Sequence, residues 1–360
     1  MLKAGRTFGI DLDWTFFNVL SRPGKFDDTA RSLGATVIHS GVELNAKVAF
    51  VRHLRSVVRS GGYDVVHCHH DIVSAVYLVS AMGLPLRRRI VHVHNADLHV
   101  PTGNAAKASL VREPMRTICL RLADRIVGIS RYALTNFLGG RPEKPSRDTV
   151  LYYGIDTSPY SGPLPDRAAI RRALDLPEDA KILLFVSRMV SYKNPLFVVE
   201  VLARLAASDT TVYAVFVGTG PLEDAVLARA AELGVSGRVR MLGWREDGAM
   251  LMRAANLFIF PRTEEFTDGA AREGLGLVVV EAQAAGLPSL LSRGIPDDAI
   301  VNPELCNVLA LAEGPDAWAA AARAIIARAR PDARASLEVI ERSPFALRAG
   351  FDNLIALHAL

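Results

Sequence analysis

Residues 181–195 have the sequence KILLFVSRMVSYKNP and predict the repeating unit of the fold. The apolar run at residues 181–187 is typical of a strand that is buried on both faces of a sheet. Asn194 and Pro195 suit the N-cap and the first turn of a following helix. A buried strand that leads through a short loop into a helix indicates a parallel α/β sheet.

Similar units recur on both sides of this segment. Helical patterns occupy, for example, residues 46–60, 195–207, 221–233 and 317–329. Further strands are predicted at residues 16–20, 35–39, 64–67, 89–94, 125–129, 149–152, 212–218, 238–242, 257–261 and 289–291. We therefore expect an α/β protein built from doubly wound, Rossmann-like domains, with ligands bound beyond the carboxyl ends of the strands.

The chain has 360 residues, which suits two domains. The polar, proline-containing stretch at residues 156–166, DTSPYSGPLPD, predicts a linker between them. We place an N-terminal domain at residues 1–160 and a C-terminal domain at residues 161–342, with a cleft between the two.

The net charge of +4 is divided unevenly between the halves of the chain. Residues 1–150 contain 21 Lys+Arg and 12 Asp+Glu, whereas the remaining residues contain 21 and 26. A basic half indicates anionic partners such as phosphates or lipid head groups, and ordinary solvated surface is the alternative. Nucleic acid is disfavoured because basic and aromatic residues are not interleaved.

Composition favours a cytoplasmic protein. No stretch approaches the roughly 20 continuous apolar residues of a membrane span. The first residues lead into no apolar signal segment. Cys68, Cys119 and Cys306 are widely spaced, which indicates free thiols in a reducing compartment.

Two carboxylates, Glu273 and Glu281, enclose an apolar, glycine-containing run in the segment EGLGLVVVEAQAAGLP at residues 273–288. Eight residues are slightly more than two helical turns, so the spacing predicts both on one helix face. A buried Glu needs a partner, which is either a ligand or a structural arginine. Glu265 repeats the spacing upstream, but no apolar helix follows it.

Cations and glycines follow two of the predicted strands. Arg188 and Lys193 lie in the loop after residues 181–187, where they suit a diphosphate clamp, although an ordinary surface loop is the alternative. Gly218 and Gly220 follow the next strand, where they permit either close approach of a ligand or a tight turn.

Eight of the nine histidines lie in residues 1–150. One predicted strand ends at His67, His69 and His70, and another ends at His92 and His94. No flanking Cys or Asp has a strong metal-ligand spacing, so we expect no metal and favour His94 as a substrate contact.

Taken together, the motifs resemble the retaining glycosyltransferases of family 4, which have the GT-B fold of two facing Rossmann-like domains. They occur in family order over about residues 150–300, and the sequence around Glu281 is most similar to exopolysaccharide-type members. The matching segments are FVSR at residues 185–188 with KNP at 193–195, VGTGP at 217–221, VRMLG at 239–243, ANLFIFP at 255–261 and EGLGLVVVEAQAAGLP at 273–288.

This resemblance implies a nucleotide-diphosphate sugar donor, a UDP-sugar above all, in the C-terminal domain and an acceptor on the N-terminal domain. Arg188 and Lys193 would bind the diphosphate and act in catalysis. Glu273 and His94 would contact the transferred sugar, and Glu281 would bind the ribose hydroxyls. The remaining donor-binding residues would be Gly218, Gly274, Leu275 and Gly276.

The family's chemistry is implied in the same way. It is hexosyl transfer with retention, without metal or cofactor, to a glycan or lipid-linked acceptor in polysaccharide biosynthesis. The C-terminal helix at residues 343–360 is expected to pack back on the N-terminal domain. Peripheral contact with the inner face of the membrane through Arg87–Arg89 and residues 107–121 is a further hypothesis, to which a helix packed on its own sheet is the alternative.

Some positions depart from the family pattern. The chain opens near the family's second strand, at residues 16–20, so the family's first strand, glycine-rich loop and first helix are expected to be missing. Ser187 replaces a usual glycine, Tyr153 replaces a usual asparagine, and the segment between Pro261 and Glu273 is longer than usual. A non-catalytic GT-B binding or scaffold subunit and a GT-B nucleotide-sugar epimerase therefore stay open as alternatives.

Overall fold

The computed structural model describes residues 2–10, 13–95, 105–263 and 273–359. The chain divides into two compact units. Unit 1 comprises Met1–Gly154 and Leu347–Leu360, and unit 2 comprises Ile155–Ala346. The domain boundaries predicted at residues 160 and 342 lie within a few residues of these limits.

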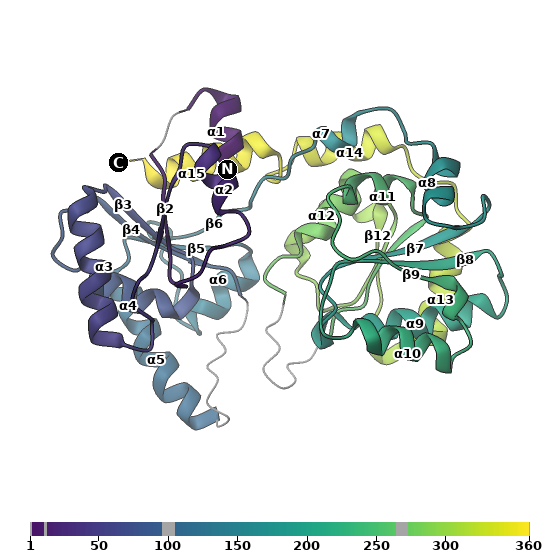
Figure 1. The fold of residues 1–360 in the computed structure, drawn as a ribbon, viewed down its shortest axis with the longest axis horizontal. Helices are drawn as coiled ribbons and strands as arrows, with labels where there is room; N and C mark the ends of the chain where they lie inside the picture. Colours follow the sequence, from purple (N-terminus) through teal and green to yellow (C-terminus); the bar gives the residue numbers. More distant parts are fainter. Residues whose placement is uncertain (1, 11–12, 96–104, 264–272, 360) are drawn as a thin grey trace. The chain divides into compact units, whose positions relative to one another are not determined.

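Unit 2 contains a six-stranded sheet in which every pairing is parallel (Figure 1). The strand order is β12-β11-β10-β7-β8-β9, so the direction of winding reverses between β7 and β10. This doubly wound arrangement confirms the predicted fold class. The strands are β7 (Lys181–Val186), β8 (Val212–Val217), β9 (Val239–Met241), β10 (Leu257–Phe260), β11 (Ser289–Leu291) and β12 (Cys306–Val308).

Helices cover both faces of this sheet. Figure 1 shows α9, α10 and α13 on one face and α11, α12 and α14 on the other. Leu183, Leu184 and Phe185 of β7 are fully buried, which explains why the strand is apolar at successive positions. The helices are α7 (Ser158–Ser161), α8 (Arg167–Ala173), α9 (Pro195–Ala206), α10 (Glu223–Glu232), α11 (Gly248–Ala254), α12 (Leu277–Ala284), α13 (Gly314–Ile326) and α14 (Ala333–Glu341).

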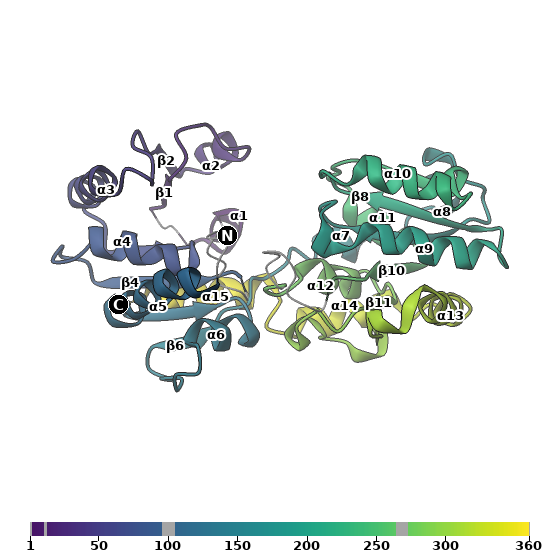
Figure 2. The ribbon, with the colours of Figure 1, turned by 90° about the horizontal axis from the view of Figure 1, so that it is seen from below.

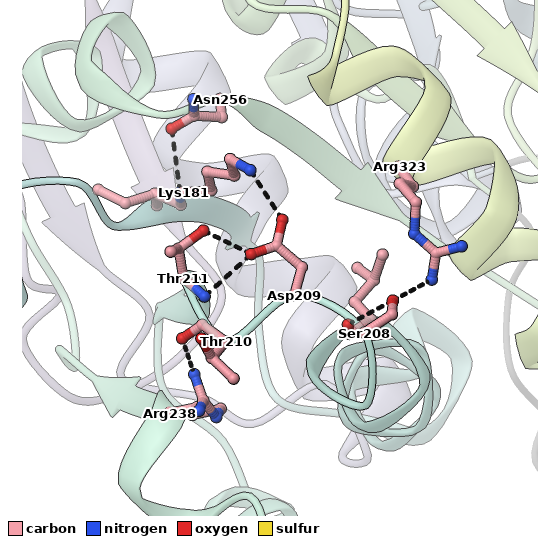
Figure 3. A network of polar contacts seen from close by, with 10 residues as sticks. Lys181, Ser208, Asp209, Thr210, Thr211, Arg238, Asn256 and Arg323 are labelled. Atoms are coloured by element: carbon pink, nitrogen blue, oxygen red, sulfur yellow. Dashed lines mark hydrogen bonds and ion pairs between the residues drawn. The ribbon is translucent and has the colours of Figure 1, made fainter.

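The turn from α9 into β8 is held by Asp209, as Figure 3 shows. Its carboxylate accepts hydrogen bonds from the Thr211 amide at 3.0 Å, the Thr211 hydroxyl at 2.6 Å and Lys181 Nζ at 2.7 Å. These donors, with the Lys181 bond the strongest, lower the pKa of Asp209 to about 2. The contact ties the start of β7 to the start of β8.

Unit 1 contains two separate parallel sheets. One pairs β1 (Thr15–Asn18) with β2 (Thr36–His39). The other has the order β3-β4-β5-β6, and in the described residues no strand joins the two sheets. Figure 2 shows β1 and β2 set apart from β4–β6. The four strands are β3 (Val65–Cys68), β4 (Arg88–Val93), β5 (Arg125–Gly128) and β6 (Asp148–Val150).

Side chains of the four-stranded sheet alternate between two cores. Val91 and Val93 of β4 belong to a core shared with α3, α4 and α6, whereas Ile90 packs with Leu354 and Leu357 of the C-terminal helix α15. The helix at the end of the chain therefore covers one face of the unit 1 sheet. The helices of unit 1 are α1 (Leu2–Phe8), α2 (Asp27–Ser32), α3 (Lys47–Gly61), α4 (Ser74–Ser80), α5 (Ala105–Leu122), α6 (Arg131–Leu138) and α15 (Leu347–His358).

Candidate functional site

The candidate site lies where the winding of the unit 2 sheet reverses. Strands β7 and β10 are direct neighbours, paired through Leu183 and Leu257. Their carboxyl ends lie at the same edge, so the loops that follow them meet. Arg188 and Lys193 follow β7, and Arg262 follows β10. The cation loop predicted from the sequence is therefore at the expected edge of the sheet.

The loop after β7 turns sharply before α9. Asn194 has φ of +56°, in the left-handed region, and Pro195 begins the helix. Asn194 is the N-cap residue, but its side chain makes no capping hydrogen bond, so the capping contact expected from the sequence is wrong. The turn buries Lys193, whose Nζ lies 4.8 Å from the centroid of the Phe260 ring.

Lys193, Arg262 and Glu273 form one ion group. Glu273 Oε2 accepts a hydrogen bond from Lys193 Nζ and lies 3.3 Å from Arg262 Nε. The side chains are nearly buried, with exposed fractions of 11% for Lys193, 2% for Arg262 and 16% for Glu273. Burial lowers the pKa of Lys193, and the charge of Glu273 opposes that change. Glu273 thus already has cationic partners when no ligand is bound.

Tyr192 holds a further cation beside this group. The Arg188, Lys193 and Arg262 cationic groups lie 5.7, 5.7 and 5.4 Å from the centroid of its ring. Arg188 Nη2 donates to the Tyr192 hydroxyl, and Arg188 makes no ion pair with any of the described residues. Two cations therefore contact the Glu273 carboxylate and a third lies beside Tyr192, which leaves positive charge for an anion.

Helix α12 begins after Glu273, at Leu277. The prediction that Glu273 and Glu281 share one helix face is therefore wrong. The cause is Gly276, the N-cap residue, whose φ of +86° turns the chain before the helix. The Glu273 side chain lies over this turn, because a Cβ on Gly276 would stand 3.5 Å from Glu273 Cγ.

The other residues proposed near this helix have different surroundings. Gly274, Leu275 and Gly276 are all buried. Glu281 lies within α12, and burial raises its pKa to about 7. Burial raises the pKa of Tyr160, and the charge of Glu281 adds to that rise. Within the described part of the chain, no hydrogen bond or ion pair links Glu281 to Glu273.

Gly218 is explained by packing between loops. It has φ of +120°, and a Cβ there would stand 2.0 Å from the Ser187 carbonyl oxygen. A Cβ on Gly220 would stand 2.5 Å from the Met189 carbonyl oxygen. Both glycines let the loop after β8 pack against the backbone that carries Arg188. Their contribution to the site is to fix the position of that loop.

His94 belongs to unit 1, whereas the other predicted site residues belong to unit 2. It follows β4, and its backbone N–H donates to Asp71 Oδ1 at 2.7 Å. His94 Nε2 lies 2.9 Å from His69 Nδ1. Burial lowers the pKa of His94, and the nearby Asp71 charge partly opposes this.

Two residues of the site were not predicted. Arg262 lies two residues after the end of β10, and Tyr192 precedes Lys193. The rule that ligand groups follow parallel strands points to Arg262, whereas nothing in the sequence distinguishes Tyr192. Glu265 and nearly all of the long segment before Glu273 lie outside the described residues.

A hollow of about 770 Å³ lies elsewhere in unit 2 and is lined by Arg167, Arg253 and Arg330 among others. Arg167 and Arg330 donate to backbone carbonyls where α11 and α12 end, whereas Arg253 donates to carbonyls of the segment that includes Gly162 and Pro163. Arg330, for example, donates to the carbonyls of Ala285 at 2.9 Å and Gly286 at 3.1 Å. Such bonds satisfy the last carbonyls of a helix. The hollow therefore has a structural explanation.

Comparison with known proteins gives a consistent result for both units. Residues 14–159 match the family model described as Glycosyltransferase Family 4, and residues 166–338 match that of Glycosyl transferases group 1. The chain is 26% identical over 326 residues to the putative glycosyltransferase EpsF of Bacillus subtilis, covering 89% of this chain and 81% of that one. It is 31% identical over 306 residues to the D-inositol 3-phosphate glycosyltransferase of Mycolicibacterium paratuberculosis, covering 81% and 65%.

Solved structures share the fold. The Anabaena protein Alr3699/HepE in complex with UDP superposes with a TM-score of 0.77 at 17% identity, covering 97% of this chain and all of that one. The same Anabaena protein has also been solved with UDP-glucose. WaaG, a glycosyltransferase involved in lipopolysaccharide biosynthesis, superposes with a TM-score of 0.69 at 18% identity, covering 96% of this chain and all of that one.

Proposed function

The chain belongs to the glycosyltransferases with the GT-B fold, and from this premise we propose that it transfers a sugar from a UDP-sugar to a glycan or lipid-linked acceptor. The reaction retains the configuration of the transferred hexose and serves the synthesis of a polysaccharide of the exopolysaccharide type. The observation that carries this proposal is the pairing of Lys193 and Arg262 with Glu273, with Arg188 on the neighbouring Tyr192, at the point where the winding of the sheet reverses.

The cations suit a nucleoside diphosphate. Lys193, Arg188 and Arg262 carry three positive charges against one carboxylate, and α12 begins four residues after Glu273, at Leu277. Guanidinium and ammonium groups form short charge-assisted hydrogen bonds to phosphate oxygens, and helix amides add to them. The UDP and UDP-glucose bound by the Anabaena protein are ligands of this class.

The carboxylates suit the two sugars of the donor. When phosphate oxygens replace Glu273 as the acceptor for Lys193, Glu273 Oε2 can accept a hydrogen bond from the transferred sugar. Glu281, nearly buried and with a pKa raised to about 7, suits the ribose hydroxyls, which both donate and accept. His94 of unit 1 contacts the transferred sugar in this scheme.

The chemical step needs a stabilised leaving group. The bond between the anomeric carbon and the β-phosphate oxygen breaks as the acceptor oxygen bonds to the same face of the sugar, and the acceptor proton passes to the leaving phosphate. Arg188 and Lys193 stabilise the charge that develops on the diphosphate. In this scheme the cations stabilise the leaving diphosphate, as a metal ion does in other transferases, so transfer requires no metal.

The acceptor side is assigned to unit 1. Its excess of basic residues favours a negatively charged membrane surface with lipid-linked saccharides, and Leu110 and Val111 of α5 are exposed beside Arg112. We infer a cytoplasmic protein with peripheral contact to the inner face of the membrane. Among the described residues, no helix combines the length and apolar character that crossing a bilayer requires.

A screen of nucleotides and nucleotide sugars tests the donor. We expect UDP and one UDP-sugar to raise the melting temperature of the full chain, and that sugar to be transferred or slowly hydrolysed. Stabilisation without any turnover would favour a scaffold subunit, and turnover that only inverts a sugar hydroxyl would favour an epimerase. No stabilisation by any nucleoside diphosphate would contradict the donor site.

A further inference from the structure

Five histidines gather at one end of the four-stranded sheet of unit 1. This histidine cluster comprises His67 of β3, His69 after it, His92 of β4, His94 after it and His358 of α15. Only His94 has a place in the proposed transfer reaction. The other four are close to one another and are unexplained by that function.

The fold explains why these residues meet. His67 pairs with Ile90 in the parallel register, so His92, two residues on, lies diagonally opposite on the same face. Ile90 faces α15, and α15 brings His358 to this face. The ring of His67 lies 4.2 Å from that of His69 and 5.2 Å from that of His92, measured between centroids.

Hydrogen bonds between the rings fix their orientation. His67 Nδ1 lies 2.9 Å from His358 Nε2, and His67 Nε2 lies 3.1 Å from His92 Nδ1. His69 Nδ1 lies 2.9 Å from His94 Nε2. If His67 and His69 donate through Nδ1, the Nε2 atom of each carries a lone pair. The outer histidines, His94 and His358, then hold the inner rings in position.

The inner rings are neutral at physiological pH. Burial lowers the pKa of His67 and His92 well below the ordinary value, and neighbouring histidines lower it further. His69 is exposed as a residue, but its ring faces the others, and desolvation there lowers its pKa to about 4.

His92 also has an unmet nitrogen. The residue is fully buried, and its Nε2 has no hydrogen-bond partner among the residues that the structure describes. A buried polar atom without a partner costs about 1–3 kcal/mol, so such an atom calls for an explanation. A cation bound within the cluster, with the ring turned to meet it, provides one.

We propose that His67, His69 and His92 bind one transition-metal ion, of which Zn²⁺ is the common example, with water as the fourth ligand. Each ring offers a nitrogen, and the three nitrogens lie within 4.8 Å of one another. Nitrogens around a tetrahedral Zn²⁺ are about 3.4 Å apart, as Zn–N bonds of about 2.05 Å require. Side-chain rotations that move each nitrogen by about 1 Å therefore complete the site, and the exposed His69 provides the route by which the ion enters.

The ligand set decides the kind of ion. Three imidazoles suit Zn²⁺, Cu²⁺, Ni²⁺ and Co²⁺, whereas Mg²⁺ and Ca²⁺ prefer oxygen ligands. His358 and His94 act as outer partners that orient the ligands, as is common in zinc sites. This inference does not rest on the transferase function. Because His69 contacts His94, however, an ion here changes the surroundings of His94, which is a proposed contact of the donor sugar.

The test is a metal titration of the full chain, freed of metal with EDTA and carrying no histidine tag. Zn²⁺ is followed by calorimetry, and Co²⁺ by the visible bands of its tetrahedral complexes. We expect one ion per chain with a micromolar or lower Kd. His69→Ala should weaken binding at least about 100-fold, and His358→Ala about 10-fold, as for an outer partner. The matched control is His70→Ala, because His70 bonds to Tyr77 at 2.7 Å instead of to the cluster.

Three outcomes would overturn the proposal: no saturable binding by the unaltered chain, unchanged binding in His69→Ala, or equal loss in His70→Ala. Circular dichroism verifies the fold of each variant. If His69→Ala does not fold, His69→Gln keeps a polar group that can bond to His94 while removing the imidazole ligand, and the same weakening is expected.

Discussion

The four-stranded sheet of unit 1 and the six-stranded sheet of unit 2 carry opposite kinds of side chain at their carboxyl ends. In unit 1 they gather imidazoles that burial keeps neutral, as in His67 and His92. In unit 2 they gather fixed charges, with Lys193 and Arg262 paired to Glu273. Parallel strands place their following loops at one edge in both units. Residue type alone thus decides whether the edge suits a cation or an anion.

The largest effect is expected from breaking the charged edge. Lys193→Ala removes the cation that neutralises both Glu273 and the leaving diphosphate, and Glu273→Ala removes the sugar contact. Each should lower kcat by about 10²–10³-fold or more, as loss of a group that stabilises transition-state charge does. Turnover of the donor identified by the nucleotide screen provides the measurement.

Arg204→Ala is the matched control, because Arg204 forms an exposed ion pair with Asp316 on the surface of the same unit. Its turnover should match that of the unaltered chain. Wild-type rates in both Lys193→Ala and Glu273→Ala, with the fold intact by circular dichroism, would refute the assigned site.

Glycine substitutions compare the loops of the two units. Gly218→Ala places a Cβ 2.0 Å from the Ser187 carbonyl oxygen at φ of +120°, so we expect a loss of about 3 kcal/mol or more in the free energy of unfolding. Gly140 in unit 1 has φ of +78° with open space around it, so Gly140→Ala should cost only about 1–2 kcal/mol. Equal shifts in melting temperature would show that the loop after β7 tolerates displacement.

Acidification should change the stability of the two units in opposite directions. In unit 1 the folded pKa of His69 is about 4 and those of His67 and His92 are also lowered. As the pH falls, the unfolded chain therefore binds protons before the folded chain does. The stability that these histidines contribute is complete above pH 6.5 and is lost as the pH falls toward 4. In unit 2 the raised pKa of Glu281, about 7, has the reverse sign, giving stability that is complete below pH 4.5 and lost as the pH rises through 7.

Hydrogen exchange of peptides from β4 and β8 at pH 7.5 and 5.0, corrected for intrinsic rates and with EDTA present, measures this difference. We expect protection of β4 to fall roughly tenfold or more on acidification, since one pKa unit corresponds to a tenfold change. Protection of β8 should stay the same or rise, and Glu281→Gln should remove any rise. An equal fall of protection in both strands would contradict this difference between the units.

The smallest effect is expected at the turn held by Asp209 (Figure 3). Asp209→Asn weakens bonds to Lys181 and Thr211 at a partly exposed site, so we expect a loss of about 0.5–1 kcal/mol. Because the folded pKa of Asp209 is about 2, this contribution is complete above pH 3.8 and lost as the pH falls through 2. Thermal melts at pH 7 and pH 2.5 should show a smaller difference at pH 2.5.

Local pattern predicted most of the strands and the edge that carries the site. The apolar runs at β7, β8 and β10 are long enough to identify a buried strand, and the polar residues after β7 follow from strand direction. Strand β12 was missed because it has three residues with Asn307 in the middle. The extra sheet formed by β1 and β2 depends on pairing that no single segment specifies.

The contacts within the site could not be predicted. Glu273 and Lys193 are 80 residues apart, and only the folded sheet brings them together. The same-face prediction for Glu281 failed because helical spacing was applied across Gly276, whose left-handed backbone ends the run. Strand ends located His67, His69, His92 and His94 of the histidine cluster, although no metal was expected there, but His358 comes from the far end of the chain.

The most direct test of the central claim, that the unit 2 edge binds a diphosphate, compares UDP with uridine by calorimetry in the unaltered chain, Arg188→Ala and Lys193→Ala. Each lost charge-assisted contact should weaken UDP binding by about 1.5–3 kcal/mol, or roughly 10- to 100-fold, and leave uridine binding unchanged. Equal weakening of both ligands, or no weakening of either, would contradict the claim.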